Sequence, residues 1–224
     1  MMKRLFTVVM LTIIFTLFYA CGERKLETRT FEKNGINYLV LVNKTNKIPD
    51  DWGENLKLTT TENLKGETIH IEKETLEKFQ ELREDLLKEG IDIEIEAALR
   101  TYQTQKQWYD RVERERGKKY AKDNMTPAGY SENQTGLAIE IVLIKNGYII
   151  HGSRDLLKEE EIFNKIHEKM PQYGFIVRYP DNKKEVTGYG YQPWHLRYVG
   201  SAELAKEIMN KGTQGTLEEY LEVK

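Results

Sequence analysis

The chain has 224 residues, of which 39% are hydrophobic and 31% charged, a balance that suits a globular domain with a sizeable core. Its formal net charge of -2 gives no electrostatic case for a nucleic-acid partner. The single cysteine excludes an internal disulfide, so the fold must be held together by its core, with or without a metal.

The N-terminus has the layout of a secretory signal peptide. Lys3 and Arg4 precede an uncharged, mostly apolar run over residues 5–20, which is short for a membrane-spanning helix. The run ends in Ala20-Cys21, which resembles a bacterial lipobox, where the cysteine is lipidated and becomes the mature N-terminus. We therefore predict a signal peptide over 1–20, a lipidated Cys21 with a tether over 21–34, and an exported lipoprotein of the bacterial cell envelope. An ordinary signal peptide and an uncleaved anchor are the alternatives.

The domain predicted over residues 35–224 begins with strand and helix patterns. Apolar residues that alternate with polar ones predict strands with one wet face, and apolar residues spaced three and four apart predict helices. Glycines and prolines place the breaks between them. In chain order we expect a buried strand over 37–43, an irregular segment over 44–64, a helix over 75–89, a strand over 91–96, a helix over 103–119 and a loop over 121–130.

The second half of the domain adds a hairpin and further helices. Asn146-Gly147 is a strong two-residue hairpin signal, and Thr216 begins a capping-box sequence. Because helices and hairpin strands mix without strict βαβ alternation, we predict an α+β fold with a small, mainly antiparallel sheet flanked by helices. The expected elements are strands over 137–144 and 148–150, a helix over 159–173, strands over 175–179 and 194–199, a helix from Ser201 to near Gly212, and a short helix after Thr216.

Two short runs carry the chemistry of the chain. Residues 131–140 have the sequence Ser-Glu-Asn-Gln-Thr-Gly-Leu-Ala-Ile-Glu, and residues 192–195 have the sequence Gln-Pro-Trp-His. Together they resemble the signatures of the VanY-type zinc D-Ala-D-Ala carboxypeptidases of the LAS metallopeptidase group, Ser-x-His-x-x-Gly-x-Ala-x-Asp and Glu-x-x-His. The resemblance covers most of residues 36–212. It implies the LAS/hedgehog-like peptidase fold, a zinc site and peptidoglycan stem peptides as ligands.

By this resemblance Asn133, Glu140 and His195 occupy the metal-ligand positions, and Gln192 that of the general base. Hydrolysis of an amide by zinc needs three ligands, an open position for water and a base. The carboxamide of Asn133 is a poor zinc ligand, and the extra methylene of Glu140 displaces its oxygens by roughly 1 Å. Gln192 cannot accept a proton at neutral pH, a loss of about 10²–10⁴-fold. We expect a degenerate site with no zinc or weakly bound zinc, with Glu132 as an alternative ligand.

Further residues are expected to form the peptide site. The resemblance places Arg100, Gln105 and Ser131 in the substrate cleft, and an arginine at a strand end can present its fork to a peptide carboxylate. The alternative for Arg100 is an ion pair that stabilises the fold. Trp194 is either a wall of the cleft or part of the core. The remaining histidines lack ligand spacing and are predicted to lie on the surface; they are His70, His151 and His167.

These residues lead to one functional prediction and two alternatives. The prediction is a D-Ala-D-Ala carboxypeptidase-like pseudoenzyme that has lost catalysis and binds D-Ala-terminated stem peptides of peptidoglycan. The first alternative is an active zinc-dependent D,D-carboxypeptidase that trims cell-wall peptides with unusual metal ligands. The second is an envelope protein-interaction module with no small ligand.

Overall fold

The computed structural model describes residues 29–210 and 215–222. The predicted signal peptide, Cys21 and most of the predicted tether lie outside these described residues. Among the residues that are described, no helix is both long and apolar enough to span a bilayer.

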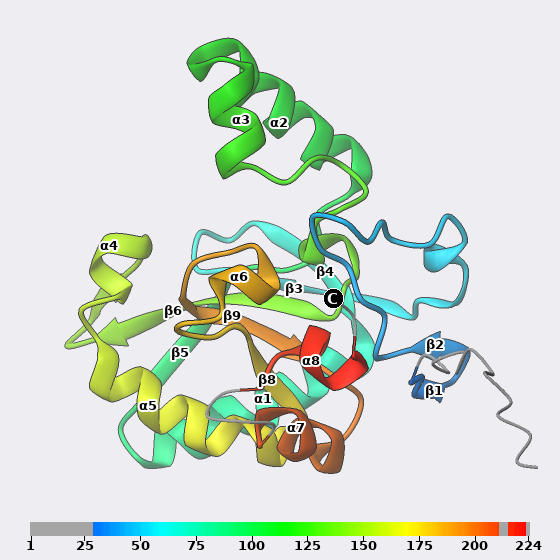
Figure 1. Ribbon diagram of the computed structural model, residues 1–224. Coiled ribbons are helices and arrows are strands. Elements are labelled where there is room, and N and C mark those ends of the chain that lie inside the picture. Colours follow the sequence, from blue (N-terminus) through cyan, green and yellow to red (C-terminus); the bar gives the residue numbers. More distant parts are fainter. Residues whose placement is uncertain (1–28, 211–214, 223–224) are drawn as a thin grey trace, which may run out of the picture.

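The described chain folds into a main sheet with helices around it and two small hairpins beside it (Figure 1). Its strands are β1 (Glu32–Lys33), β2 (Ile36–Asn37), β3 (Leu58–Glu62), β4 (Thr68–Glu72), β5 (Asp92–Ala97), β6 (Ala138–Lys145), β7 (Tyr148–Ile150), β8 (Phe175–Tyr179) and β9 (Gln192–Tyr198). Its helices are α1 (Lys73–Lys88), α2 (Tyr102–Arg116), α3 (Lys118–Asn124), α4 (Ser153–Leu156), α5 (Glu160–Lys169), α6 (Lys184–Thr187), α7 (Ala202–Met209) and α8 (Leu217–Leu221), with 3₁₀ turns η1 (Trp52–Asn55), η2 (Glu132–Gln134) and η3 (Met170–Tyr173).

The main sheet has the strand order β5-β6-β9-β8, with β7 also paired to β6, and each of these pairs is antiparallel. This confirms the predicted α+β class. The register places Glu140 on β6 opposite His195 on β9. A second pair joins Gln192 on β9 to Tyr179 on β8. The two signature runs, some 50 residues apart in the sequence, therefore lie side by side.

The helix and hairpin with the clearest sequence signals form where they are expected. On α1, Leu76, Phe79 and Leu82 are buried on one face, each contributing roughly 1.5–3 kcal/mol by leaving water. The expected hairpin turn at Asn146 and Gly147 has both residues at positive φ, 54° and 79°, as a type I′ turn requires. Helix α1 packs against β5, α5 and η3, and α7 packs against β8.

The strand predicted over 37–43 is wrong beyond β2. Tyr38, Val40 and Val42 are buried as expected, but their segment pairs with no strand of the described chain. Arg197 Nη2 donates to the carbonyls of Tyr38 and Val40 at 3.0 and 2.9 Å, and Arg178 Nη2 donates to that of Val42 at 3.3 Å. Buried guanidinium groups thus take the place of a neighbouring strand as donors to this backbone.

Three other segments differ from the sequence-based expectations. The stretch 44–64 contains β3, whose Thr-rich sequence lacks the apolar alternation that signals a strand. The helix expected over 103–119 breaks at Gly117, which has φ of 88°, and α3 then extends into the predicted loop. Together α2 and α3 form an arm that projects from the sheet at the top of Figure 1. Phe31, in the predicted tether, packs against the core beside the β1–β2 hairpin.

Candidate functional site

The signature positions meet in one small cavity. Turn η2 carries Asn133, β6 carries Glu140, and β9 carries both Gln192 and His195. All four line a cavity of about 150 Å³. Its other lining residues come from the arm, from the loop after α3 and from the β8–β9 region; they are Arg100, Gln105, Trp108, Met125, Thr126, Ser131, Glu132, Tyr179 and Tyr189.

The three side chains that the resemblance assigns as metal ligands lie together, and two of them share a hydrogen bond. Asn133 Nδ2 donates to Glu140 Oε1 at 2.5 Å, and His195 Nδ1 lies 3.9 Å from the same oxygen. His195 is 4% exposed, and its Nε2 is buried without a hydrogen-bond partner among the described residues. Burial lowers the pKa of His195, which favours a neutral imidazole.

This donor set is a poor fit for a catalytic zinc ion. The amide nitrogen of Asn133 donates a hydrogen bond to the carboxylate of Glu140. An imidazole at this position would instead offer a lone pair to a zinc ion that the carboxylate also binds. No cluster of three or more His, Cys, Asp or Glu side chains suited to a metal occurs within residues 29–210 and 215–222. Gln192 lines the cavity with a carboxamide, which cannot act as a base.

Glu132 cannot serve as the replacement ligand that the sequence allowed. Its carboxylate accepts from Arg178 Nε at 2.5 Å and from Arg197 Nη1 at 2.8 and 2.6 Å. The two guanidinium groups hold the pKa of Glu132 below its ordinary value in spite of burial. This carboxylate is therefore committed to ion pairs within the protein.

Arg100 lies at the mouth of the cavity and is held there on several sides. Its backbone N–H donates to Asn133 O at 2.7 Å, and its Nη1 donates to Gln105 Oε1 at 2.9 Å. The guanidinium carbon lies 4.4 Å from the Trp108 ring centroid, and Nη2 is 3.9 Å from Glu140 Oε1. Arg100 was predicted either to line the cleft or to form an ion pair within the fold, and in the structure it does both.

Gln105 fixes the cleft side of the arm. It is 1% exposed, and its Nε2 donates to Thr126 O at 2.5 Å while its Oε1 accepts from Arg100. The predicted Ser131 also lines the cavity. Trp194 is not among the residues that line it; it is partly buried and packs against the core.

Tyr179 and Tyr189 are cavity residues that the sequence reasoning did not single out individually. The Tyr179 ring lies 4.7 Å from that of Tyr189 and 4.9 Å from that of His195, centroid to centroid. Tyr189 is also hydrogen-bonded through its hydroxyl to Thr126 Oγ1. In the sequence, the tyrosine-rich stretch between 179 and 198 was the signal that could have pointed to these two residues. Packing of tyrosines around the hairpin explained that stretch equally well.

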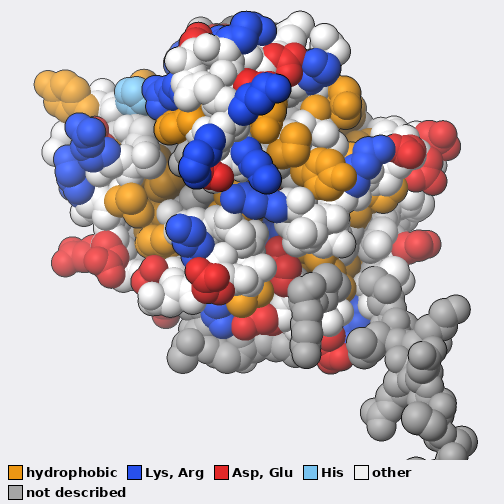
Figure 2. All heavy atoms as spheres, turned by 45° about the horizontal axis from the view of Figure 1, so that its top comes forward, with side chains coloured by type: hydrophobic (Ala, Val, Ile, Leu, Met, Phe, Trp, Pro, Cys, Tyr) orange, Lys and Arg blue, Asp and Glu red, His pale blue; other side chains and the backbone are white. Residues whose placement is uncertain are grey.

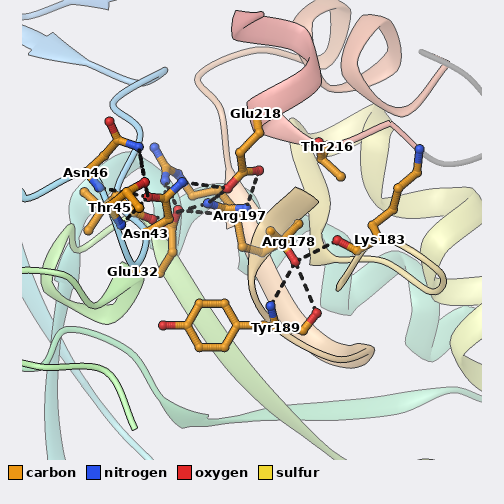
Figure 3. Close-up of polar contacts among 12 residues, drawn as sticks. Asn43, Thr45, Asn46, Glu132, Arg178, Lys183, Tyr189, Arg197, Thr216 and Glu218 are labelled. Carbon is orange, nitrogen blue, oxygen red and sulfur yellow. Dashed lines mark hydrogen bonds and ion pairs between the residues drawn. The ribbon is translucent and has the colours of Figure 1, made fainter. Parts of the chain in front are cut away.

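A buried ionic frame, drawn in Figure 3, adjoins the cavity through Glu132, which also lines it. It joins Glu132, Arg178, Arg197 and Glu218, each at most 2% exposed. Arg178 binds Glu218 through Nη1 and Nη2 at 2.9 and 2.8 Å, which attaches α8 to the sheet. Because Glu132 precedes Asn133 and Arg178 precedes Tyr179 in the chain, the frame also fixes the cavity walls. In the sequence, the signal for this frame was Arg178, a charged residue inside the otherwise apolar strand over 175–179.

The surface prediction for the remaining histidines holds for two of them. His70 and His151 are exposed, whereas His167 is half-buried and therefore contradicts the prediction. Its Nε2 lies 2.9 Å from Pro193 O, and its ring packs on Phe163 at 5.8 Å. Its position on the inward side of α5 explains the error.

Comparison with known proteins identifies the family. Residues 68–201 match the family model described as VanY: D-alanyl-D-alanine carboxypeptidase. The chain belongs to the VanY family. It is 34% identical to YodJ of Bacillus subtilis, a protein provisionally named a carboxypeptidase, over 85% of the chain and 69% of YodJ. It is 36% identical to a D-alanyl-D-alanine carboxypeptidase of Enterococcus faecium over 69% of the chain, but spans only 45% of that relative.

Solved VanY structures confirm the predicted fold. The vancomycin-resistance D,D-pentapeptidase VanY in complex with Zn(II) superposes with a TM-score of 0.64 at 30% identity, covering 82% of this chain and 98% of that structure. VanYB in complex with D-alanine-D-alanine gives the same TM-score and identity, covering 84% of this chain and 98% of that structure. The departures at Asn133, Glu140 and Gln192, and the match at His195, rest on the sequence resemblance given above.

Proposed function

We propose that this VanY-family protein is catalytically impaired and binds peptides that end in D-Ala-D-Ala, with peptidoglycan stem peptides as its ligands. The observation that carries the proposal is the hydrogen bond from Asn133 Nδ2 to Glu140 Oε1, formed where a zinc-binding imidazole is expected. It pairs two of the three ligand positions with each other. Without a bound metal, the pKa of the water that must attack the peptide is not lowered, and the carboxamide of Gln192 cannot take its proton.

The same cavity keeps the groups that would hold a peptide. The Arg100 fork lies at its mouth and can bind a terminal carboxylate through two parallel hydrogen bonds. The Gln192 carboxamide and His195 Nε2, which has no hydrogen-bond partner among the described residues, can pair with peptide N–H and C=O groups. The VanYB complex with D-alanine-D-alanine supports this choice of ligand.

Isothermal titration of the full-length protein with a Lys-D-Ala-D-Ala peptide tests the proposal. We expect measurable binding at millimolar ligand or below. Arg100→Gln should weaken it by about 10–100-fold, because a hydrogen bond to a charged group contributes about 1.5–3 kcal/mol. Arg154→Gln, which removes an exposed arginine on α4, is the matched control and should bind like the wild type. Absence of heat at millimolar peptide contradicts the proposal.

A second candidate function is an active zinc carboxypeptidase, favoured by the buried Nε2 of His195, which has no partner among the described residues. Incubating the zinc-loaded protein with the same peptide and assaying free D-Ala distinguishes the two. Release that stops on adding a chelator and in His195→Ala supports the enzyme. The absence of release, together with binding in the titration, supports the impaired site.

We also propose that the protein is exported and held on the membrane by a lipid on Cys21, with its domain beginning after the tether. The support is the sequence alone, in the basic start, the apolar run and the Ala20-Cys21 pair. In a bacterial host, Cys21→Ser should move the protein out of the detergent-soluble membrane fraction. Retention of Cys21→Ser in that fraction, at wild-type mobility on a gel, contradicts lipidation.

A further inference from the structure

A second hollow adjoins the cavity along the arm. It has a volume of about 450 Å³ and is lined by Arg100, Thr104, Gln107, Trp108, Arg111 and Arg114. Apart from Arg100, these residues recur three and four apart on α2, so they share one face of that helix. No carboxylate is among the lining residues. We name this hollow the arginine groove.

The arginine groove is continuous with the candidate site. Arg100 and Trp108 line both hollows, and the guanidinium of Arg100 stacks on the Trp108 ring between them. Lys and Arg side chains gather near the middle of the face shown in Figure 2, with apolar side chains beside them. A ligand whose end lies at Arg100 can therefore continue along α2 without crossing a ridge of acidic side chains.

Arg100 of the arginine groove approaches Glu140, but the other two arginines of the groove have no charged partner in the described part of the chain. Arg111 and Arg114 are exposed, and neither forms a hydrogen bond or ion pair with any residue that the structure describes. Two lysines of the arm are paired, Lys106 with Asp110 at 2.6 Å and Lys119 with Asp123 at 2.7 Å.

The length of the groove sets where a ligand charge must lie. The seven residue steps from Thr104 to Arg111 rise about 10 Å along the helix, and Arg114 lies about 5 Å further. An extended peptide advances about 3.3–3.6 Å per residue. With a C-terminal carboxylate at Arg100, a group three or four residues upstream reaches the level of Arg111.

We propose that the arginine groove is a subsite for an acidic peptide, and that Arg111 and Arg114 bind a carboxylate three or four residues before its C-terminus. This inference rests on the proposed binding of D-Ala-terminated peptides and names a determinant of their selection. The planar forks of two arginines suit a carboxylate held in two parallel hydrogen bonds. A stem peptide meets the requirement where its D-Glu is linked through the γ-carboxyl and leaves the α-carboxylate free.

Two synthetic peptides that differ in one group test the subsite. Both are L-Ala-γ-D-Glu-L-Lys-D-Ala-D-Ala with acetylated lysine, and in the second the free α-carboxylate of D-Glu is converted to a carboxamide. Titrated into the full-length wild type at low salt, the acidic peptide should bind about five-fold more tightly, since an exposed charge pair contributes modestly. Arg111→Gln/Arg114→Gln should bind both peptides alike, at the affinity of the amidated one.

The control for this double variant is Arg154→Gln/Lys206→Gln, which removes the same charge from exposed positions on α4 and α7. It should keep the five-fold preference. Equal binding of the two peptides by the wild type overturns the subsite and leaves the proposed function standing. Binding of neither peptide overturns the proposed function and the subsite with it. Equal peptide binding combined with polyphosphate binding that needs Arg111 and Arg114 assigns the groove to phosphate polyanions and overturns the peptide subsite.

Discussion

At Asn133 the difference from the family signature concerns the direction of a hydrogen bond. A zinc-binding imidazole offers a lone pair to the metal, whereas the Asn133 amide offers a proton to Glu140 Oε1. The sequence predicted a poor ligand at this position. It could not predict that the amide would turn toward Glu140, because that contact depends on how turn η2 places Asn133 relative to β6.

Restoring the family residues should restore chemistry if the rest of the pocket is intact. We predict that Asn133→His/Glu140→Asp/Gln192→Glu binds zinc and releases D-Ala from Lys-D-Ala-D-Ala, at a rate at least 10²-fold above the wild type. Metal analysis after dialysis and a D-Ala assay measure the two effects. Gln192→Glu alone should stay inactive, since it adds a base without a metal. A triple variant that holds zinc without turnover would show that other cavity residues have also diverged.

At the scale of elements, local signals decided which predictions succeeded. The Asn146-Gly147 turn, the Ser201 cap of α7 and the Thr216 capping box of α8 all form as predicted, because each depends on residues a few positions apart. The predicted strand over 37–43 failed because the partners of its carbonyls are arginines more than 130 residues away. Long-range side-chain contacts of that kind leave no periodic trace in the sequence.

Helix α8 depends on the ionic frame, so a single neutralisation there should be costly. Glu132 and Glu218 balance Arg178 and Arg197 in a buried group. Glu218→Gln leaves one buried positive charge uncompensated, and we predict a loss of about 3–5 kcal/mol in the free energy of unfolding. Urea unfolding followed by fluorescence measures it. Glu222→Gln, on an exposed side chain at the end of α8, should change stability by about 0.5 kcal/mol or less.

At the scale of the whole molecule, the cavity lies between the buried part of the fold and the exposed arm formed by α2 and α3. The ionic frame and the sheet contribute buried residues to its lining, while α2 buries only Gln105 among its residues. The sequence predicted the sheet and the helix, but it did not predict that one would be buried and the other exposed. The residue pattern of α2 predicts a helix and does not show how that helix is placed relative to the sheet. The arrangement leaves the basic face of α2 open to a ligand beside the site.

The inward position of His167 should make the stability of the whole fold depend on pH. Burial lowers the pKa of His167 from 6.5 to about 4. Between these values the unfolded chain binds a proton that the folded chain does not, so the free energy of unfolding decreases as the pH falls through this window. We predict a loss of about 1–3 kcal/mol from this residue between neutral pH and about pH 4.

Urea unfolding at a series of pH values, with His167→Gln as the test variant, isolates this contribution. Glutamine can still donate to Pro193 O but takes up no proton, so its stability should vary less with pH than that of the wild type. His151→Gln, at an exposed position, should follow the wild-type curve. If the curves of the wild type and His167→Gln run parallel from neutral pH to about pH 4, the ring is protonated in the folded state as easily as in the unfolded one. The contact between α5 and β9 would then give the fold no sensitivity to acid.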